Sequence, residues 1–196
     1  RTIFKFIVMS GKAIILCAPS GSGKTTLAKF LLSNEKLNLK FSVSATTREM
    51  RINEQDGIDY NFLEVNNFKN KINKEEFIEY EEVYHNVFYG TLKSDVKKLI
   101  LNHNLIFDVD VVGAISLKKY FSDKALTIFI NPPSLKVLED RLTQRGLNSQ
   151  DDLQERINKA KKEIEMKSTF DYSITNDDLE KAKLNIFEKV EDFLNS

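Results

Sequence analysis

Short runs of consecutive apolar residues alternate along this chain with longer segments of helical periodicity. Three runs, at 13–17, 105–109 and 125–130, have the length and composition of strands that are buried on both faces of a sheet. Apolar residues at helical spacing follow over 25–33, 94–101, 112–121, 134–144 and 178–194. Strands that alternate with helices predict an α/β fold, with a parallel sheet and helices on both of its faces.

The pattern changes between the first helix and the second of these strands, where short runs alternate apolar and polar residues. The candidate strands there are 41–45, 60–63, 77–81 and 86–89. Alternation of this kind is typical of a half-exposed sheet, so we expect a small mixed or antiparallel sheet inserted into the core. A strongly charged helical segment covers 149–167 near the end of the chain.

Composition narrows the possible classes of function. The chain has 196 residues, 41% hydrophobic and 30% charged, which fits one globular domain. Lys+Arg and Asp+Glu number 29 each, so no basic excess points to nucleic acid as a partner. A single cysteine excludes an internal disulfide and favours a cytoplasmic location. No apolar run approaches the roughly 18 residues of a membrane span, so we expect no membrane partner; residues 1–8 are expected to be a non-core extension.

A phosphate-binding motif separates the first predicted strand from the first predicted helix. Its residues are Ala18, Pro19, Ser20, Gly21, Ser22, Gly23, Lys24, Thr25 and Thr26. Main-chain N–H groups of such a loop, together with a helix N-terminus, bind phosphate oxygens. Lys24 would then reach the β- and γ-phosphates of a nucleotide, and the Thr25 hydroxyl would bind Mg²⁺. Ala18 replaces the first glycine of the consensus, so the strand and helix around the motif carry much of the prediction.

Arginine is scarce in this chain, with six residues against 23 lysines. A retained arginine is informative because its planar guanidinium binds phosphate through two parallel hydrogen bonds, which lysine cannot do. Apart from Arg1, the arginines form two groups: Arg48 and Arg51 in the inserted segment, and Arg141, Arg145 and Arg156 on late helices. Two such groups beside a phosphate loop indicate an enzyme with two phosphorylated ligands. Ordinary surface ion pairs are the alternative explanation.

Several ordered motifs resemble the guanylate kinase family. Residues 44–48, 59–62, 77–79 and 88–91 are similar to its nucleoside-monophosphate lobe, and 107–113, 132–134, 141–146 and 176–178 continue the match in the family's order. The resemblance runs from about residue 12 to the C-terminus. It implies one domain: a phosphate-loop kinase core at about 10–40, 92–140 and 168–196, a GMP-binding lobe at about 41–91, and a helical lid at about 141–167. It also implies Mg²⁺-dependent transfer of phosphate from ATP to GMP or dGMP, within purine nucleotide metabolism and GMP recycling.

The resemblance further assigns roles to individual residues of the acceptor site. Glu79 would accept the N1–H and N2–H₂ protons of guanine, with Thr91 and Ser44 as hydroxyl partners. A carboxylate there would reject adenine, whose N1 is an acceptor, because polar groups would remain unpaired. The GMP phosphate would be held by Arg48, Arg51, Tyr60 and Tyr89. Asp110 would orient Arg48 or the guanine, and Glu54 would complete the wall of this site.

The same resemblance also assigns residues to the donor site, where ATP would bind. The phosphate loop and Asn176 would bind ATP, and Asp108 would act on the Mg²⁺ shell, through water, together with Thr25. Catalysis would depend on Lys24, Arg48, Arg141, Arg145 and Arg156, which stabilise the charge of the phosphoryl group during transfer.

Two other interpretations stay open beside the kinase. A guanylate-kinase-like interaction module would have lost catalysis, but Lys24, Thr25 and the late arginines are all present. A phosphate-loop kinase with another phosphorylated acceptor, such as a ribose bisphosphate, is opposed by Glu79 together with Thr91. The sequence does not distinguish a monomer from a homo-oligomer.

Overall fold

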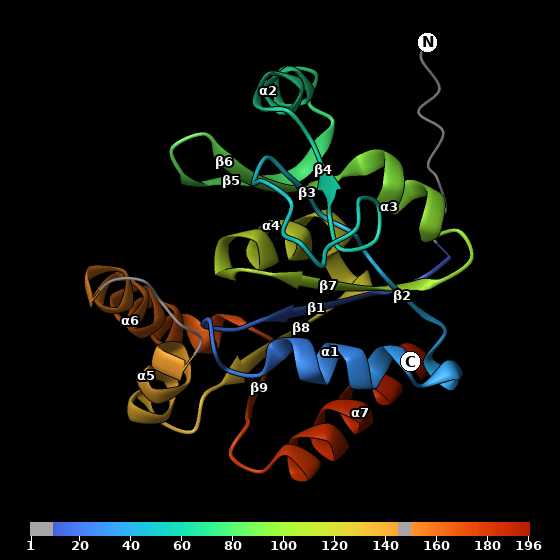
Figure 1. Cartoon of the computed structure of the whole chain (residues 1–196). Coiled ribbons are helices and arrows are strands. Elements are labelled where there is room, and N and C mark those ends of the chain that lie inside the picture. The colour runs from blue at the N-terminus through green and yellow to red at the C-terminus, as the bar shows by residue number, and fades with distance from the viewer. Residues whose placement is uncertain (1–9, 145–149) are drawn as a thin grey trace.

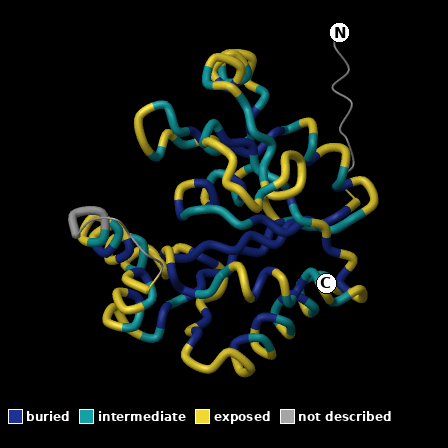
Figure 2. The backbone as a smooth tube through the Cα atoms, viewed as in Figure 1, coloured by how far each residue is buried: buried dark blue, intermediate teal, exposed yellow. Residues whose placement is uncertain are grey.

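A five-stranded parallel sheet forms the centre of the computed structural model, which describes residues 10–144 and 150–196 (Figure 1). The strand order is β2 (Leu39–Phe41), β7 (Asn104–Val109), β1 (Ala13–Cys17), β8 (Ala125–Asn131) and β9 (Tyr172–Thr175). The three predicted buried runs are therefore the three central strands. They are buried along most of their length (Figure 2), as continuous apolar runs in a covered parallel sheet should be.

Helices cover both faces of this sheet and bury its alternate side chains. The helices α1 (Lys24–Leu32) and α7 (Leu179–Asn195) pack on one face, around Ile14 and Ile106. On the other face, α3 (Lys93–Leu99) and α4 (Val111–Phe121) pack around Ile15 and Phe107. This two-sided cover confirms the predicted α/β fold class.

Two further helices pack mainly against each other, at one end of the sheet (Figure 1). They are α5 (Leu135–Gln144) and α6 (Gln150–Glu165), and their shared apolar cluster contains Leu138, Leu142 and Ile157. Short 3₁₀ turns lie at Glu35–Leu37, Ser122–Lys124 and Met166–Thr169. No helix among the described residues is both long and apolar enough to cross a bilayer.

A second, four-stranded mixed sheet lies above the core and forms a separate lobe (Figure 1). Its order is β4 (Asn61–Phe62), β3 (Ala45–Thr46), β6 (Val87–Leu92) and β5 (Phe77–Tyr84). A helix, α2 (Val65–Asn73), covers it with Phe68, whose ring stacks 4.3 Å from that of Phe77. This helix was not predicted, although Val65, Phe68 and Ile72 share the i, i+3, i+7 spacing of one helical face.

The single strand predicted at 41–45 is wrong. The structure divides this segment: β2 ends at Phe41 as the edge of the core sheet, and β3 begins at Ala45 in the lobe. Residues 42–44 carry the chain from one sheet to the other. Alternating polarity could not reveal the division, because an edge strand and a lobe strand are both half-exposed.

The carboxyl ends of β1 and β7 set the position of the candidate site. These strands are in parallel register, with Leu16 beside Asp108 and Cys17 beside Val109. After β1 the chain enters α1 on one face of the sheet, and after β7 it enters α4 on the other. Ligands of open α/β sheets bind where two such connections diverge, and the phosphate loop begins at this point.

Candidate active site

Glycine geometry and two side chains from elsewhere in the core shape the phosphate loop. Gly21 and Gly23 adopt φ angles of +93° and +91°, a left-handed conformation that glycine adopts readily. The Asn176 amide donates to the carbonyl oxygen of Ser22 at 2.8 Å, and the Arg141 guanidinium donates to that of Gly21 at 3.3 Å. A Cβ atom at Gly23 would collide with the Asn176 amide nitrogen. The loop conformation is therefore held through its carbonyl groups, and no described protein atom accepts from the Gly21 or Gly23 N–H groups.

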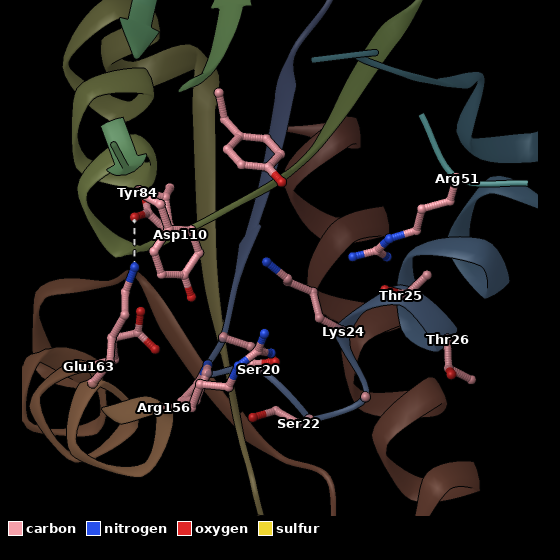
Figure 3. A pocket seen from close by; sticks show the side chains of 17 residues that line it. Ser20, Ser22, Lys24, Thr25, Thr26, Arg51, Tyr84, Asp110, Arg156 and Glu163 are labelled. Atoms are coloured by element: carbon pink, nitrogen blue, oxygen red, sulfur yellow. Dashed lines mark ion pairs between the residues drawn. The ribbon is translucent and has the colours of Figure 1, made fainter. Parts of the chain in front are cut away.

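A cavity of about 440 Å³ opens over this loop (Figure 3). Its walls combine three regions: the loop itself, Arg51 and Tyr89 of the lobe, and Arg156 of α6. Within the described part of the chain, no acidic side chain pairs with the guanidinium of Arg51 or of Arg156. The buried Ser22 hydroxyl likewise has no hydrogen-bond partner. Free cations, a free hydroxyl and a helix N-terminus together make this cavity suited to anions.

The Lys24 ammonium contacts two oxygen atoms at the end of β7. It lies 2.5 Å from Asp108 Oδ1 and donates to the Val109 carbonyl oxygen at 2.7 Å. Thr25 and Asp108 line a neighbouring cavity of about 450 Å³, together with Ser44 and Tyr60. A hydroxyl and a carboxylate on one wall are the hard oxygen donors that Mg²⁺ prefers.

Glu79 and Thr91 face each other across β5 and β6. The Thr91 hydroxyl donates to Glu79 Oε1 at 2.5 Å, while the position of a Cβ at Gly113 would lie 3.1 Å from Oε2. Burial raises the pKa of Glu79 to about 7, against the lowering effect of the Thr91 hydrogen bond, and the charge of Asp110 adds to the rise. A partly buried carboxyl group near its titration point can ionise when a ligand brings hydrogen-bond donors to it.

The lobe arranges its arginines around one carboxylate, Glu54. Arg48 Nη2 lies 2.8 Å from Glu54 Oε1, and the main-chain N–H of Arg51 donates to Glu54 Oε2 at 2.9 Å. Arg48 Nε also donates to the Tyr89 hydroxyl at 3.2 Å, and its guanidinium lies over the Tyr60 ring. The hydrogen bond from Arg48 lowers the pKa of Glu54, so Glu54 stays ionised and holds this side of the site.

Most of the predicted site residues line cavities around the phosphate loop, but they are divided among several cavities. Asp110 does not contact Arg48: its Oδ1 accepts from the Gly113 N–H at 2.8 Å and so caps α4. Arg141 and Asn176 line a second cavity that does not include Arg156, although Gly21, Gly23 and Thr26 of the phosphate loop line both cavities. Arg145 lies outside the described residues, as does the expected extension at 1–8.

Sequence reasoning missed four residues that line the cavity over the phosphate loop: Val83, Tyr84, Lys159 and Glu163. The last two follow Arg156 at i+3 and i+7, which places them on the same face of α6. Burial raises the pKa of Glu163 to about 6. The spacing was visible in the sequence, but a helix this rich in charge offers many such sets.

A phosphate loop at the switch point of a parallel sheet, facing a separate arginine-lined lobe, defines a phosphate-loop kinase that acts on a small phosphorylated acceptor. Comparison with known proteins agrees with this class: the family model described as "Guanylate kinase" matches residues 10–196. The chain belongs to the guanylate kinase family.

Individual relatives match over nearly their whole length. The chain is 51% identical to the guanylate kinase of Porphyromonas gingivalis, over 86% of this chain and 90% of the relative. It is 47% identical to the guanylate kinase of Bacteroides thetaiotaomicron, over 98% and 95%. Among solved structures, the crystal structure of guanylate kinase from Anaplasma phagocytophilum matches with a TM-score of 0.76 and 28% identity, over 95% of this chain and 87% of that one.

Proposed function

We propose that this protein transfers the γ-phosphoryl group of ATP to GMP or dGMP, releasing ADP and the nucleoside diphosphate. One observation carries the proposal beyond family membership: a single cavity has the phosphate loop on one wall and, on another, Arg51, whose guanidinium has no acidic partner among the described residues. Figure 3 shows Arg51 reaching from the lobe toward the loop residues Lys24 and Thr25. Two phosphorylated ligands that enter from these two sides would meet end to end, as in-line transfer requires.

Phosphoryl transfer depends mainly on positioning and on stabilising charge, and the protein's cations supply both. Lys24 would leave Asp108 and bind the β- and γ-phosphate oxygens of ATP. Arg51 and Arg48 would hold the GMP phosphate, with the Tyr60 and Tyr89 hydroxyls beside them. Arg156 would stabilise the phosphoryl group during transfer, from the α6 side. Arg141 would contact ATP and also hold the conformation of the phosphate loop through the Gly21 carbonyl group. Arg145 is proposed for the donor side on the resemblance alone.

Base recognition is proposed for the Glu79–Thr91 pair. The guanine N1–H and N2–H₂ groups are adjacent donors, and an ionised Glu79 accepts from both through its two oxygens. Ser44 is proposed as a further hydroxyl partner. Adenine offers an acceptor at N1, so it would leave the carboxylate unpaired, and rejection by unpaired buried polar groups is strong.

We infer that ATP binds with Mg²⁺. Thr25 and Asp108 would hold the ion on the wall that they share, Asp108 through water. Among the described residues no group of three or more His, Cys, Asp or Glu side chains forms a metal cluster. Phosphate oxygens would therefore supply the remaining ligands, as they usually do for Mg²⁺. The ion would neutralise charge on the transferring phosphates.

A coupled assay of ADP release with GMP, dGMP or AMP as acceptor tests this proposal. We expect turnover with GMP and dGMP, and for AMP a kcat/KM lower by roughly 10⁴-fold, the discrimination that unpaired polar groups provide. Equal turnover of AMP would contradict the base-recognition assignment. Binding of GMP without ADP release would indicate a non-catalytic module instead. We also propose a cytoplasmic location, where a lone buried thiol such as Cys17 remains reduced.

A further inference from the structure

One lysine of α6 contacts both of the other regions that surround the cavity. Lys159 Nζ lies 3.9 Å from Glu81 Oε1, which belongs to β5 of the lobe. The same nitrogen lies 3.8 Å from Asp110 Oδ2, at the start of α4 in the core. Figure 3 marks the contact with Asp110 at the edge of the cavity. Within the described residues, these are the only ion pairs that join α6 to the lobe or to the core.

Lys159 also sits where carboxyl groups crowd together. Glu81 and Asp110 are within hydrogen-bonding reach of each other, and this contact raises the pKa of Glu81 to about 7. Glu163 faces the same point from α6, and Glu79 approaches Asp110 from β5. Lys24 is the other cation that acts on Asp110. An ammonium group between Glu81 and Asp110 therefore offsets repulsion that would otherwise push β5, α4 and α6 apart.

Arg156 stands one helical turn before Lys159 and has no ion-pair partner among the described residues, yet it lines the cavity. Its place over the loop must come from the placement of α6 as a whole. The apolar cluster that α6 shares with α5 contains no lobe residue, and Ile164 of α6 packs against the core cluster that contains Phe129 and Phe170. These apolar contacts fix α6 to α5 and to the core, whereas its link to the lobe among the described ion pairs is the one from Lys159 to Glu81.

We propose that Lys159 is a positioning residue for phosphoryl transfer: by binding Glu81 and Asp110, it holds α6 against lobe and core and thereby places Arg156 at the phosphate loop. This inference rests on the proposed function. The Lys159 side chain is 50% exposed and its ion pairs are long, at 3.9 and 3.8 Å, so each pair by itself is weak. The effect arises because a small shift of α6 moves Arg156, and misplacement of a catalytic group lowers turnover.

Steady-state kinetics of Lys159→Met test the proposal. We expect kcat to fall about fivefold while the KM for GMP stays within about twofold, since Arg156 acts on the moving phosphoryl group and not on bound GMP. Lys159→Arg should restore most of kcat because it keeps the charge. Lys161→Met is the matched control: it removes one exposed lysine of the same helix that makes no described contact, and kcat should not change.

Glu81→Gln tests the same link from the lobe. It should lower kcat by about half as much on a logarithmic scale, because Asp110 still binds Lys159. If the two side chains act through one contact, the double variant Glu81→Gln/Lys159→Met should be no slower than Lys159→Met alone. Independent, multiplying losses would overturn the proposal, as would equal kcat values for Lys159→Met and Lys161→Met, or a loss confined to KM.

A distance measurement that needs no activity separates this proposal from the proposed function. Spin labels at Asn67→Cys of α2 and Glu165→Cys of α6, both exposed, report the separation of lobe and lid. Burial raises the pKa of Cys17 to about 12, so the native thiol should stay unlabelled. In the ligand-free protein, Lys159→Met should broaden the distance distribution and Lys161→Met should not. Identical distributions would refute the positioning role, whereas a wild-type protein inactive with GMP would refute only the proposed function.

Discussion

The phosphate loop and the acceptor lobe are proposed to bind the same kind of group, a phosphate, and they are built by different means. The loop is nine consecutive residues that line the cavity, and Gly21 and Gly23 make its left-handed conformation accessible. The lobe instead assembles side chains from β3 to β6 and the loops between them, and it orients Arg48 and the Arg51 main chain with one carboxylate, Glu54. A site made of main chain survives many substitutions, whereas a site made of side chains depends on each of them.

The two regions also differ in what the substrate must displace. On the donor side Lys24 is paired with Asp108, so ATP must replace an ion pair. On the acceptor side the pKa of Glu79 is raised to about 7, so in the proposed complex GMP would bind to, or create, the ionised form. Substitutions on the donor side should therefore act mainly through the loss of a positive charge. Substitutions of Glu79 on the acceptor side should act mainly by changing how GMP affinity depends on pH.

The largest effect is expected on the donor side, from Lys24→Ala. We expect kcat to fall by at least about 10³-fold, or about 4 kcal/mol, because Lys24 acts on charge that develops during transfer. The Kd for GMP should stay within about twofold. Steady-state kinetics and calorimetry measure the two quantities, with exposed Lys36→Ala as control. Near-normal turnover would disprove the phosphate-loop assignment and with it the contrast between the regions.

On the acceptor side, Glu79→Gln should weaken GMP binding and spare ATP. An amide cannot accept both guanine donors, and losing a hydrogen bond to a charged group costs roughly 1.5–3 kcal/mol, or about 10- to 150-fold in Kd. Calorimetry with each nucleotide measures the split, and exposed Glu75→Gln serves as the control. An equal loss for both nucleotides would mean a general folding defect.

The same substitution should stabilise the ligand-free protein at high pH. Because the folded-state pKa of Glu79 is raised from 4.5 to about 7, its favourable contribution is complete below pH 4.5 and is lost as the pH rises through 7. At pH 8 the wild-type protein buries an ionised carboxylate, so Glu79→Gln should raise the free energy of unfolding by about 1–2 kcal/mol. Near pH 4.5 the difference should disappear. Urea titrations at several pH values test this, and a constant difference would contradict the raised pKa.

GMP affinity should follow the opposite course with pH. Under the proposed recognition guanine binds the ionised Glu79, so the wild-type Kd should fall as the pH rises through about 7, by up to about tenfold per pH unit below that value. Glu79→Gln should lose this dependence. Calorimetry between pH 5.5 and 8 provides the comparison.

The smallest effects should come from lysine in place of arginine, which keeps charge but removes the planar guanidinium. Arg51→Lys should chiefly raise the KM for GMP, by roughly fivefold, since Arg51 is proposed to hold the phosphate before and during transfer. Arg156→Lys should chiefly lower kcat by a similar factor, since its proposed contact forms as the phosphoryl group moves. The same kinetic pattern from both variants would remove the division into two sites.

Local pattern alone determined the three central strands of the core sheet and the phosphate loop, but not the edge strands β2 and β9. Strands β1, β7 and β8 are continuous apolar runs because both of their faces are covered, and such runs are visible in the sequence. The loop is also local, since its glycines, Lys24 and Thr25 are neighbours in the chain. The lobe was less predictable: its strands are short and half-exposed, so the pattern did not reveal the division between β2 and β3. The helix α2 was also missed, although the spacing of its apolar residues was visible in the sequence.

Tertiary structure decided which charged groups meet. The sequence placed Arg48 and Glu54 in one segment, but only the fold shows that Glu54 binds Arg48 while Asp110 caps α4. Lys159, Glu81 and Asp110 lie far apart in the chain, on α6, β5 and the start of α4, and no local spacing could link them. A sequence does not show which charged side chains form pairs, because pairing depends on distances of a few ångströms between elements. The packing of the whole domain sets those distances.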